Sequence, residues 1–159
     1  IVFFDTLLNM LTVDEIKSVL AHEIGHYKKN HILKSIILFS VISFVFLYVF
    51  YNFLNILYLD SYIPMDLAPS FIAVLFVLIS PLISFFLIPL LSALSRRNEF
   101  QADNYAKIHT DSKDLISSLV KLSKGNLSLI KSSPIYSSFY SSHPSVFDRI
   151  KNLQEKINE

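Results

Sequence analysis

The pentapeptide His22-Glu23-Ile24-Gly25-His26 sets a condition that the whole fold has to meet. Two histidines four residues apart lie on one face of a helix, so both imidazoles can bind one metal ion. The intervening Glu23 is spaced to act as general base on a water at that metal. A catalytic zinc site also needs a third protein ligand and one open position. The fold therefore has to bring another ligand to this helix from elsewhere in the chain.

Glu99 is the ligand that the sequence offers, on a second helix predicted over residues 96–109. Asp103 lies one turn further along the same face. We expect Asp103 to orient a ligand histidine through its free ring nitrogen. A charged pair on one helix face is more often a solvated surface, but the histidine motif upstream favours a metal site. The residues predict one Zn²⁺ per chain, bound by His22, His26 and Glu99, in a zinc peptidase.

Two uncharged segments, residues 35–59 and 67–95, separate these motifs. Each exceeds the roughly 20 apolar residues that cross a bilayer. The chain is 52% hydrophobic with a mean hydropathy of +0.48, too apolar for an ordinary small soluble fold. The alternative is a pair of buried core helices, which a domain this small could not cover on all sides. We expect a mainly α fold, a membrane helical hairpin joined to a zincin-like helical metalloprotease domain.

The charges that flank the two segments predict their orientation. Residues 60–66, between them, carry only acidic charge, whereas the outer flanks are basic. By the positive-inside rule the basic flanks face the cytosol. Residues 1–34 and 96–159 would then be the catalytic parts on the cytosolic side of a single peptidase domain, residues 1–159. The membrane would be the endoplasmic reticulum in a eukaryote or the inner membrane in a bacterium. The basic flanking residues are Lys28, Lys29, Lys34, Arg96 and Arg97.

The remaining elements follow from local patterns. Residues 1–8 are apolar and predict a short N-terminal edge strand, with free backbone groups that could pair with an extended substrate. Thr12 and Glu15 predict a capping box opening the helix of the histidine motif, which could continue into the first span. A further helix is expected from residue 111 or 112 to near Gly125, followed by a loop over residues 126–142.

A last helix is predicted to start at Ser142-His143-Pro144, because proline suits a first helical turn. His143, which lies near Arg149 in the sequence, is a candidate to donate to the oxyanion of a tetrahedral intermediate. A histidine before a proline is more often a helix cap, so this assignment competes with a structural one. His31 and His109 are interpreted as structural and as surface residues.

The overall composition excludes some functions. A formal net charge of +1 supplies no strongly basic surface for nucleic acid. The chain contains no cysteine, so a metal site must use nitrogen and oxygen ligands. It begins at Ile1 without a signal-peptide pattern, and we expect it to be part of a longer protein.

With these motifs in place, the chain resembles the integral-membrane CAAX prenyl proteases, zinc endopeptidases that trim prenylated C-termini. The resemblance implies His22, His26 and Glu99 as zinc ligands, Glu23 as catalytic base and Asp103 as a proton-handling partner. It also implies His143 and Arg149 as substrate-side or oxyanion contacts. The matching stretches are FDTLL (4–8), HEIGHYKKNH (22–31), RRNEFQADNYA (96–106), LVKLSKGNLS (119–128) and SHPSVFDRI (142–150).

The resemblance covers the whole chain and corresponds to the C-terminal part of the family. It therefore implies further N-terminal transmembrane helices of the same protein, contact with the lipid bilayer, and a peptide or protein substrate that can carry a prenyl group. One alternative is an HtpX-like membrane quality-control metalloprotease, which also pairs this motif with membrane hairpins. Another is a non-catalytic membrane scaffold with a vestigial zinc site.

Overall fold

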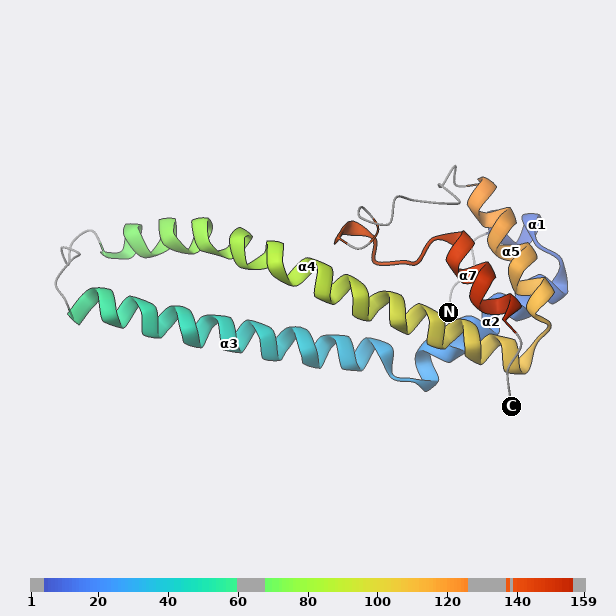
Figure 1. Ribbon diagram of the computed structural model, residues 1–159, viewed down its shortest axis with the longest axis horizontal. Helices are drawn as coiled ribbons and strands as arrows, with labels where there is room; N and C mark the ends of the chain where they lie inside the picture. The colour runs from blue at the N-terminus through green and yellow to red at the C-terminus, as the bar shows by residue number, and fades with distance from the viewer. Residues whose placement is uncertain (1–4, 60–67, 126–136, 138, 156–159) are drawn as a thin grey trace. The chain divides into compact units, whose positions relative to one another are not determined.

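The computed structural model describes residues 5–59, 68–125, 137 and 139–155, and within them the regular elements are all helices (Figure 1). The chain divides into two compact units. The first combines Ile1–His31 with Ile88–Glu159, and the second is Ile32–Leu87. The predicted mainly α fold with two membrane helices is confirmed.

The first unit is built from short amphipathic helices around a small core. These are α1 (Asp5–Met10), α2 (Val13–Lys28), α5 (Ser112–Gly125), α7 (Val146–Gln154) and the end of α4 (Ala68–His109). The helix predicted to end near Gly125 is confirmed as α5. The buried apolar cluster is Ala21, Ala106, Leu115, Leu119 and Leu153, with Ile116 and Val146 packed against it.

A capping box begins α2, as predicted. The Thr12 hydroxyl accepts from the Glu15 N–H, and the Glu15 carboxylate accepts from the Thr12 N–H at 2.7 Å. The same carboxylate is 2.8 Å from Lys121 Nζ and accepts from the Ser117 hydroxyl at 2.6 Å, both on α5. These bonds, that of Lys121 first, lower the pKa of Glu15 to about 2. One buried carboxylate therefore caps α2 and fastens α5 to it.

A tight turn separates α2 from the next helix, α3 (His31–Leu59). Asn30 has a φ of 54°, a left-handed conformation that asparagine tolerates better than most residues. The N–H groups of Lys29 and Asn30 bond back to the carbonyls of Gly25 and Tyr27, each at 3.0 Å. The prediction that the α2 helix could continue into the first span is wrong, because this turn stops it.

The predicted N-terminal edge strand is wrong over its described part. Residues 5–8 belong to the helix α1, and residues 1–4 lie outside the described residues. The sequence Asp-Thr-Leu-Leu-Asn-Met places an acidic residue in the first turn and good helix formers behind it. An apolar run this short does not distinguish strand from helix by its period. The proposed pairing of this segment with substrate loses its basis.

Two further boundaries differ from the prediction. The last helix begins at Val146 with Ser145 as its N-cap, whereas we predicted a start at Ser142-His143-Pro144. The Ser145 hydroxyl accepts from the N–H of Asp148, so serine capping outweighs the preference of proline for a first turn. The helix predicted over residues 96–109 is the end of α4, which continues from the second span without a break.

The second unit is a helical hairpin formed by α3 and the first part of α4, which lie side by side (Figure 1). Both helices contain stretches long and apolar enough to cross a membrane, and neither stretch is buried within the described residues. Soluble core helices would be covered, so this finding favours membrane helices. Large apolar side chains such as Phe39, Phe44 and Tyr48 are exposed along α3, as lipid-facing residues are.

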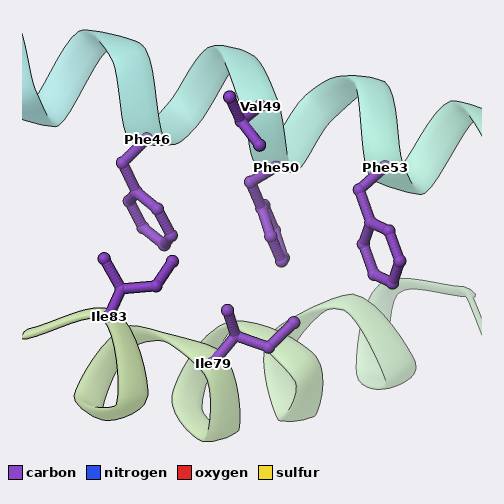
Figure 2. A pocket seen from close by; sticks show the side chains of 6 residues that line it. All are labelled: Phe46, Val49, Phe50, Phe53, Ile79 and Ile83. Carbon is purple, nitrogen blue, oxygen red and sulfur yellow. The ribbon is translucent and has the colours of Figure 1, made fainter. Parts of the chain in front are cut away.

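Aromatic side chains hold the two helices of the hairpin together. Phe46 and Phe50 of α3 contact Phe76 of α4, with ring centroids 5.7 and 5.6 Å apart. Beside these rings lies an apolar cavity of about 210 Å³. Figure 2 shows phenylalanines of α3 pointing toward isoleucines of α4 across it. Its lining residues are Phe46, Val49, Phe50, Phe53, Ile79 and Ile83.

Candidate metal centre

The close approach of α2 and α4 positions the site. A Cβ atom built on Gly25 would lie 3.0 Å from the Cβ of Tyr105 and 3.1 Å from the Cα of Ala102. Any side chain at position 25 would therefore press on the backbone of α4. Glycine lets the two helices meet at short range, so that side chains one turn away on each helix can converge.

Three potential metal ligands converge at this contact: His22, His26 and Glu99. The Nε2 atoms of the two histidines are 3.2 Å apart. Glu99 Oε2 is 3.6 Å from Nε2 of His22, and its Oε1 is 3.5 Å from Nε2 of His26. In a tetrahedral zinc site with bonds of about 2.0–2.2 Å, neighbouring donor atoms lie about 3.3–3.6 Å apart. The two histidine nitrogens each lie near this distance from a different oxygen of Glu99, so the three residues offer donor types that zinc binds, with all candidate ligand atoms within 4.8 Å of one another.

Asp103 holds the other nitrogen of His22. Its Oδ1 lies 2.9 Å from His22 Nδ1, and its side chain is fully buried. Arg149 of α7 donates two hydrogen bonds to the same carboxylate, from Nε to Oδ2 at 2.8 Å and from Nη2 to Oδ1 at 2.5 Å. The negative charge of Asp103 favours a proton on His22 Nδ1, which leaves the lone pair of Nε2 directed toward Glu99 and His26.

His26 contacts a different partner. Its Nδ1 lies 3.1 Å from Nδ1 of His31, whose Nε2 is 3.1 Å from Oε1 of Gln101 on α4. Burial, and then the neighbouring His22, lower the pKa of His26. Both effects favour the neutral imidazole, which is the form that binds a metal.

His143 lies at the exposed edge of the centre. Its Nδ1 is 3.1 Å from Glu99 Oε1, and 69% of its side chain is accessible to solvent. The bond to Glu99 raises the pKa of His143. Arg96 of α4 donates to the carbonyls of Ser137 and Ser141 at 2.9 and 2.8 Å, which fastens the segment before His143 to the helix that carries Glu99.

Glu23 is the exposed member of the motif, in contrast to the buried His22 beside it. Its side chain is therefore accessible to solvent. Arg149 is mostly buried, and its Nη1 lies 3.5 Å from Glu99 Oε2. Among the residues predicted as oxyanion contacts, His143 is accessible to a substrate, whereas Arg149 is bonded to the carboxylates behind the donors.

The structure places six of the residues singled out from the sequence in contact with one another, and the seventh, Glu23, follows His22 on α2 with an exposed side chain. The six are His22, His26, Glu99, Asp103, His143 and Arg149. Two further residues of the centre were missed. His31 was interpreted as structural, and Gln101 was not considered. His31 stands at the end of the stretch HEIGHYKKNH, but its distance of five residues from His26 matches no helical period, so the spacing did not predict the contact.

The chain belongs to peptidase family M48, whose family model matches residues 1–157. It is 35% identical to CAAX prenyl protease 1 of Saccharomyces cerevisiae over 174 residues, covering 96% of this chain and 37% of that protein. It is 36% identical to the CAAX prenyl protease 1 homolog of Homo sapiens, covering 89% of this chain and 30% of the relative.

A solved structure agrees with the fold. The crystal structure of S. mikatae Ste24p matches with a TM-score of 0.76 and 30% sequence identity, covering 96% of this chain and 39% of that one. The chain therefore spans about a third of the length of the relatives that it matches.

Proposed function

We propose that this chain is the catalytic part of a membrane-embedded zinc endopeptidase of the CAAX prenyl protease type. The observation that carries the proposal is the convergence of His22, His26 and Glu99, whose candidate ligand atoms all lie within 4.8 Å of one another, with the exposed Glu23 between the two histidines on α2. Three protein ligands leave the fourth position for water or substrate, as in catalytic rather than structural zinc sites.

Bound zinc would supply a Lewis acid that polarises the scissile carbonyl and acidifies the attacking water. Glu23 would take a proton from that water and deliver it to the leaving amine as the peptide bond breaks. Asp103 would keep the ligand His22 in the required tautomer through its Nδ1. Arg149, bonded to Asp103, would compensate the charge of the buried carboxylate.

His143 would donate a hydrogen bond to the oxyanion that develops during hydrolysis. Its exposure at the edge of the centre, together with a raised pKa that favours the proton-bearing imidazolium, supports this role. Such a donor is worth about 10²–10³ in turnover in other hydrolases. The positive charge of Arg149 would also stabilise the oxyanion electrostatically, from its position beside Asp103 and Glu99.

The substrate would be a peptide or protein, and its C-terminus would carry a prenyl group. The names of the similar proteins from yeast and human support this substrate class. The same names disfavour the HtpX-like alternative. A vestigial scaffold is disfavoured because every residue expected for catalysis is present and the three potential metal ligands lie close together.

The active site would face the cytosol. The basic residues Lys28 and Arg97 lie on the flanks of the two apolar segments, whereas residues 60–66 carry only acidic charge. This asymmetry supports the orientation by the positive-inside rule.

The test is to measure bound zinc and hydrolysis of a farnesylated peptide with the purified full chain and two variants. Glu23→Gln should retain zinc and lose about 10²–10⁴ of the turnover, because proton transfer is lost and no ligand is removed. Glu99→Gln should lose zinc. Removing metal with a chelator should abolish hydrolysis, and zinc should restore it. Normal turnover by Glu23→Gln, or zinc-free activity, would refute the proposal.

A further inference from the structure

We propose that His31 and Gln101 form a hydrogen-bonded relay that fixes the tautomer and the ring orientation of His26 as a metal ligand. This inference rests on the zinc site proposed above and adds two positioning residues to it. His31 contacts His26, and Gln101 contacts His31, so both would act through His26.

The geometry of the relay is specific. His31 is buried, with 3% of its surface exposed. Its Nδ1 meets Nδ1 of His26 at 3.1 Å, and its Nε2 meets Gln101 Oε1 at 3.1 Å. The rings of His26 and His31 stand edge to face, at an interplanar angle of 82°. Both nitrogens of His31 are therefore engaged, one toward the metal centre and one toward α4.

The proton positions follow from the chemistry of the three groups. A neutral imidazole has one donor and one acceptor nitrogen, and an amide oxygen only accepts. Gln101 Oε1 therefore takes a hydrogen bond from Nε2–H of His31. Nδ1 of His31 is then an acceptor, and Nδ1 of His26 must donate to it. Nε2 of His26 is left unprotonated, and this is the atom that faces His22 and Glu99.

The two ligand histidines are thus held by different means. Asp103, a buried carboxylate balanced by Arg149, accepts from His22. A second buried carboxylate at His26 would need another cation to balance its charge, and burial of an unpaired charge is costly. The pair of His31 and Gln101 accepts from His26 without adding charge. The relay therefore completes the support of the donors in a site that already contains Glu99 and Asp103.

The local fold explains how His31 reaches this place. His31 follows His26 by five residues, which is not a spacing that aligns side chains on one helix. The left-handed conformation of Asn30, with φ of 54°, ends α2 and turns the chain before α3 begins at His31. This turn brings the ring of His31 back against that of His26.

Zinc affinity of the full chain, measured by competition with a chelator, tests the relay. His31→Phe keeps the ring volume and removes the acceptor, so the zinc dissociation constant should rise about 10–100-fold, as for other supporting partners of metal ligands. His31→Asn can place an amide oxygen near the original Nδ1 and should recover most of the affinity. Gln101→Leu should weaken zinc binding in the same direction. The matched control is His109→Phe, because His109 is an exposed histidine whose ring bonds to the Tyr105 carbonyl.

A second readout does not depend on the metal. Nitrogen-15 NMR of labelled histidine in the metal-free chain should show His26 with its proton on Nδ1, and His31→Phe should shift part of the population to Nε2–H. Unchanged affinity and an unchanged tautomer in both His31→Phe and Gln101→Leu would overturn the relay, while leaving the zinc proposal intact. A parent chain that binds no zinc would overturn both. If His31→Phe does not fold, the Gln101→Leu measurement decides.

Discussion

Gly25 of α2 lies directly against Ala102 of α4, so that an added Cβ atom would stand 3.1 Å from the Cα of Ala102 and 3.2 Å from its carbonyl oxygen. The proposed metal ligands lie on the same two helices, within one turn of this contact. The distance between the helices at Gly25 therefore controls the spacing of the donors.

Gly25→Ala should weaken zinc binding and lower the melting temperature. Alanine favours a helix by roughly 0.5–1 kcal/mol over glycine, but overpacking against a backbone costs about 1–3 kcal/mol. The packing cost should prevail, because the backbone of α4 cannot turn aside. Gly125→Ala is the control, since its Cβ would meet only the flexible end of Met10. Thermal unfolding and zinc titration of both variants would measure the difference. Equal behaviour would show that the helices separate without cost.

Asp103→Asn should keep the contact with His22 and remove the charge that Arg149 neutralises. Removing one partner of a buried ion pair costs on the order of 3 kcal/mol, and loss of a partner of a metal ligand weakens zinc about 10–100-fold. Both effects should appear in unfolding and in chelator competition. Asp14→Asn, which changes an exposed carboxylate on α2, should alter neither. A zinc affinity equal to that of the parent would remove Asp103 from the support of the site.

Acidification should weaken the attachment of α5 to α2 through Glu15. The bonds from Lys121, Ser117 and Thr12 lower the folded-state pKa of Glu15 from 4.5 to about 2. A carboxylate with a depressed pKa contributes stability above its unfolded-state pKa and loses it as the pH falls toward the folded-state value. The parent should therefore lose stability between pH 4.5 and about 2 more steeply than Glu15→Gln. Melting temperatures across this range would check the slope. Parallel curves would contradict the assignment.

The membrane hairpin should depend on Phe50 more than on its neighbours. Phe50 is 8% exposed and its ring contacts Phe46 and Phe76. Packing is the main force between helices in lipid, so Phe50→Ala should lower the melting temperature in detergent. Phe44 lies on the same helix but is 74% exposed, and Phe44→Ala should have little effect. Similar losses in the two variants would indicate that α3 and α4 are not held by these rings.

The orientation of the hairpin can be tested with single cysteines, because the chain has none of its own. Cysteine at Lys28 or Arg97 should react with an impermeant reagent added from the cytosolic side. Cysteine within residues 60–66 should react from the opposite side only. The charges around the spans give this expectation. Labelling of residues 60–66 from the cytosol would reverse the proposed topology.

Most residues of the candidate site could be proposed from the sequence because their chemistry follows from short patterns. The spacing of His22 and His26, and of Glu99 and Asp103, places each pair on one helix face without knowledge of the fold. The length of each uncharged segment can likewise be read from the sequence, and it is enough to predict a membrane-spanning helix. The capping box of Thr12 and Glu15 is equally local, and the structure contains it.

The features that the sequence did not predict depend on tertiary contacts or on weak local preferences. His31 reaches His26 only through the turn at Asn30, so helical periodicity could not relate them. The helix at Asp5–Met10 was mistaken for a strand because a short apolar run fits both periods. The capping-box pattern accounts for Glu15 as a cap of α2, and it gives no indication that the same carboxylate also bonds to α5.

The order of the ligands along the chain has a consequence for biosynthesis. On the proposed ligand set, His22 and His26 are synthesised before α3, whereas Glu99 follows the apolar part of α4. A nascent chain that has just emerged from the ribosome holds two of the three donors and has yet to thread either span through the bilayer. On this ligand set, the three donors would come together only after both spans have been inserted. A chain whose hairpin stalls in the translocon would have only two of the three proposed donors on the side where they could meet.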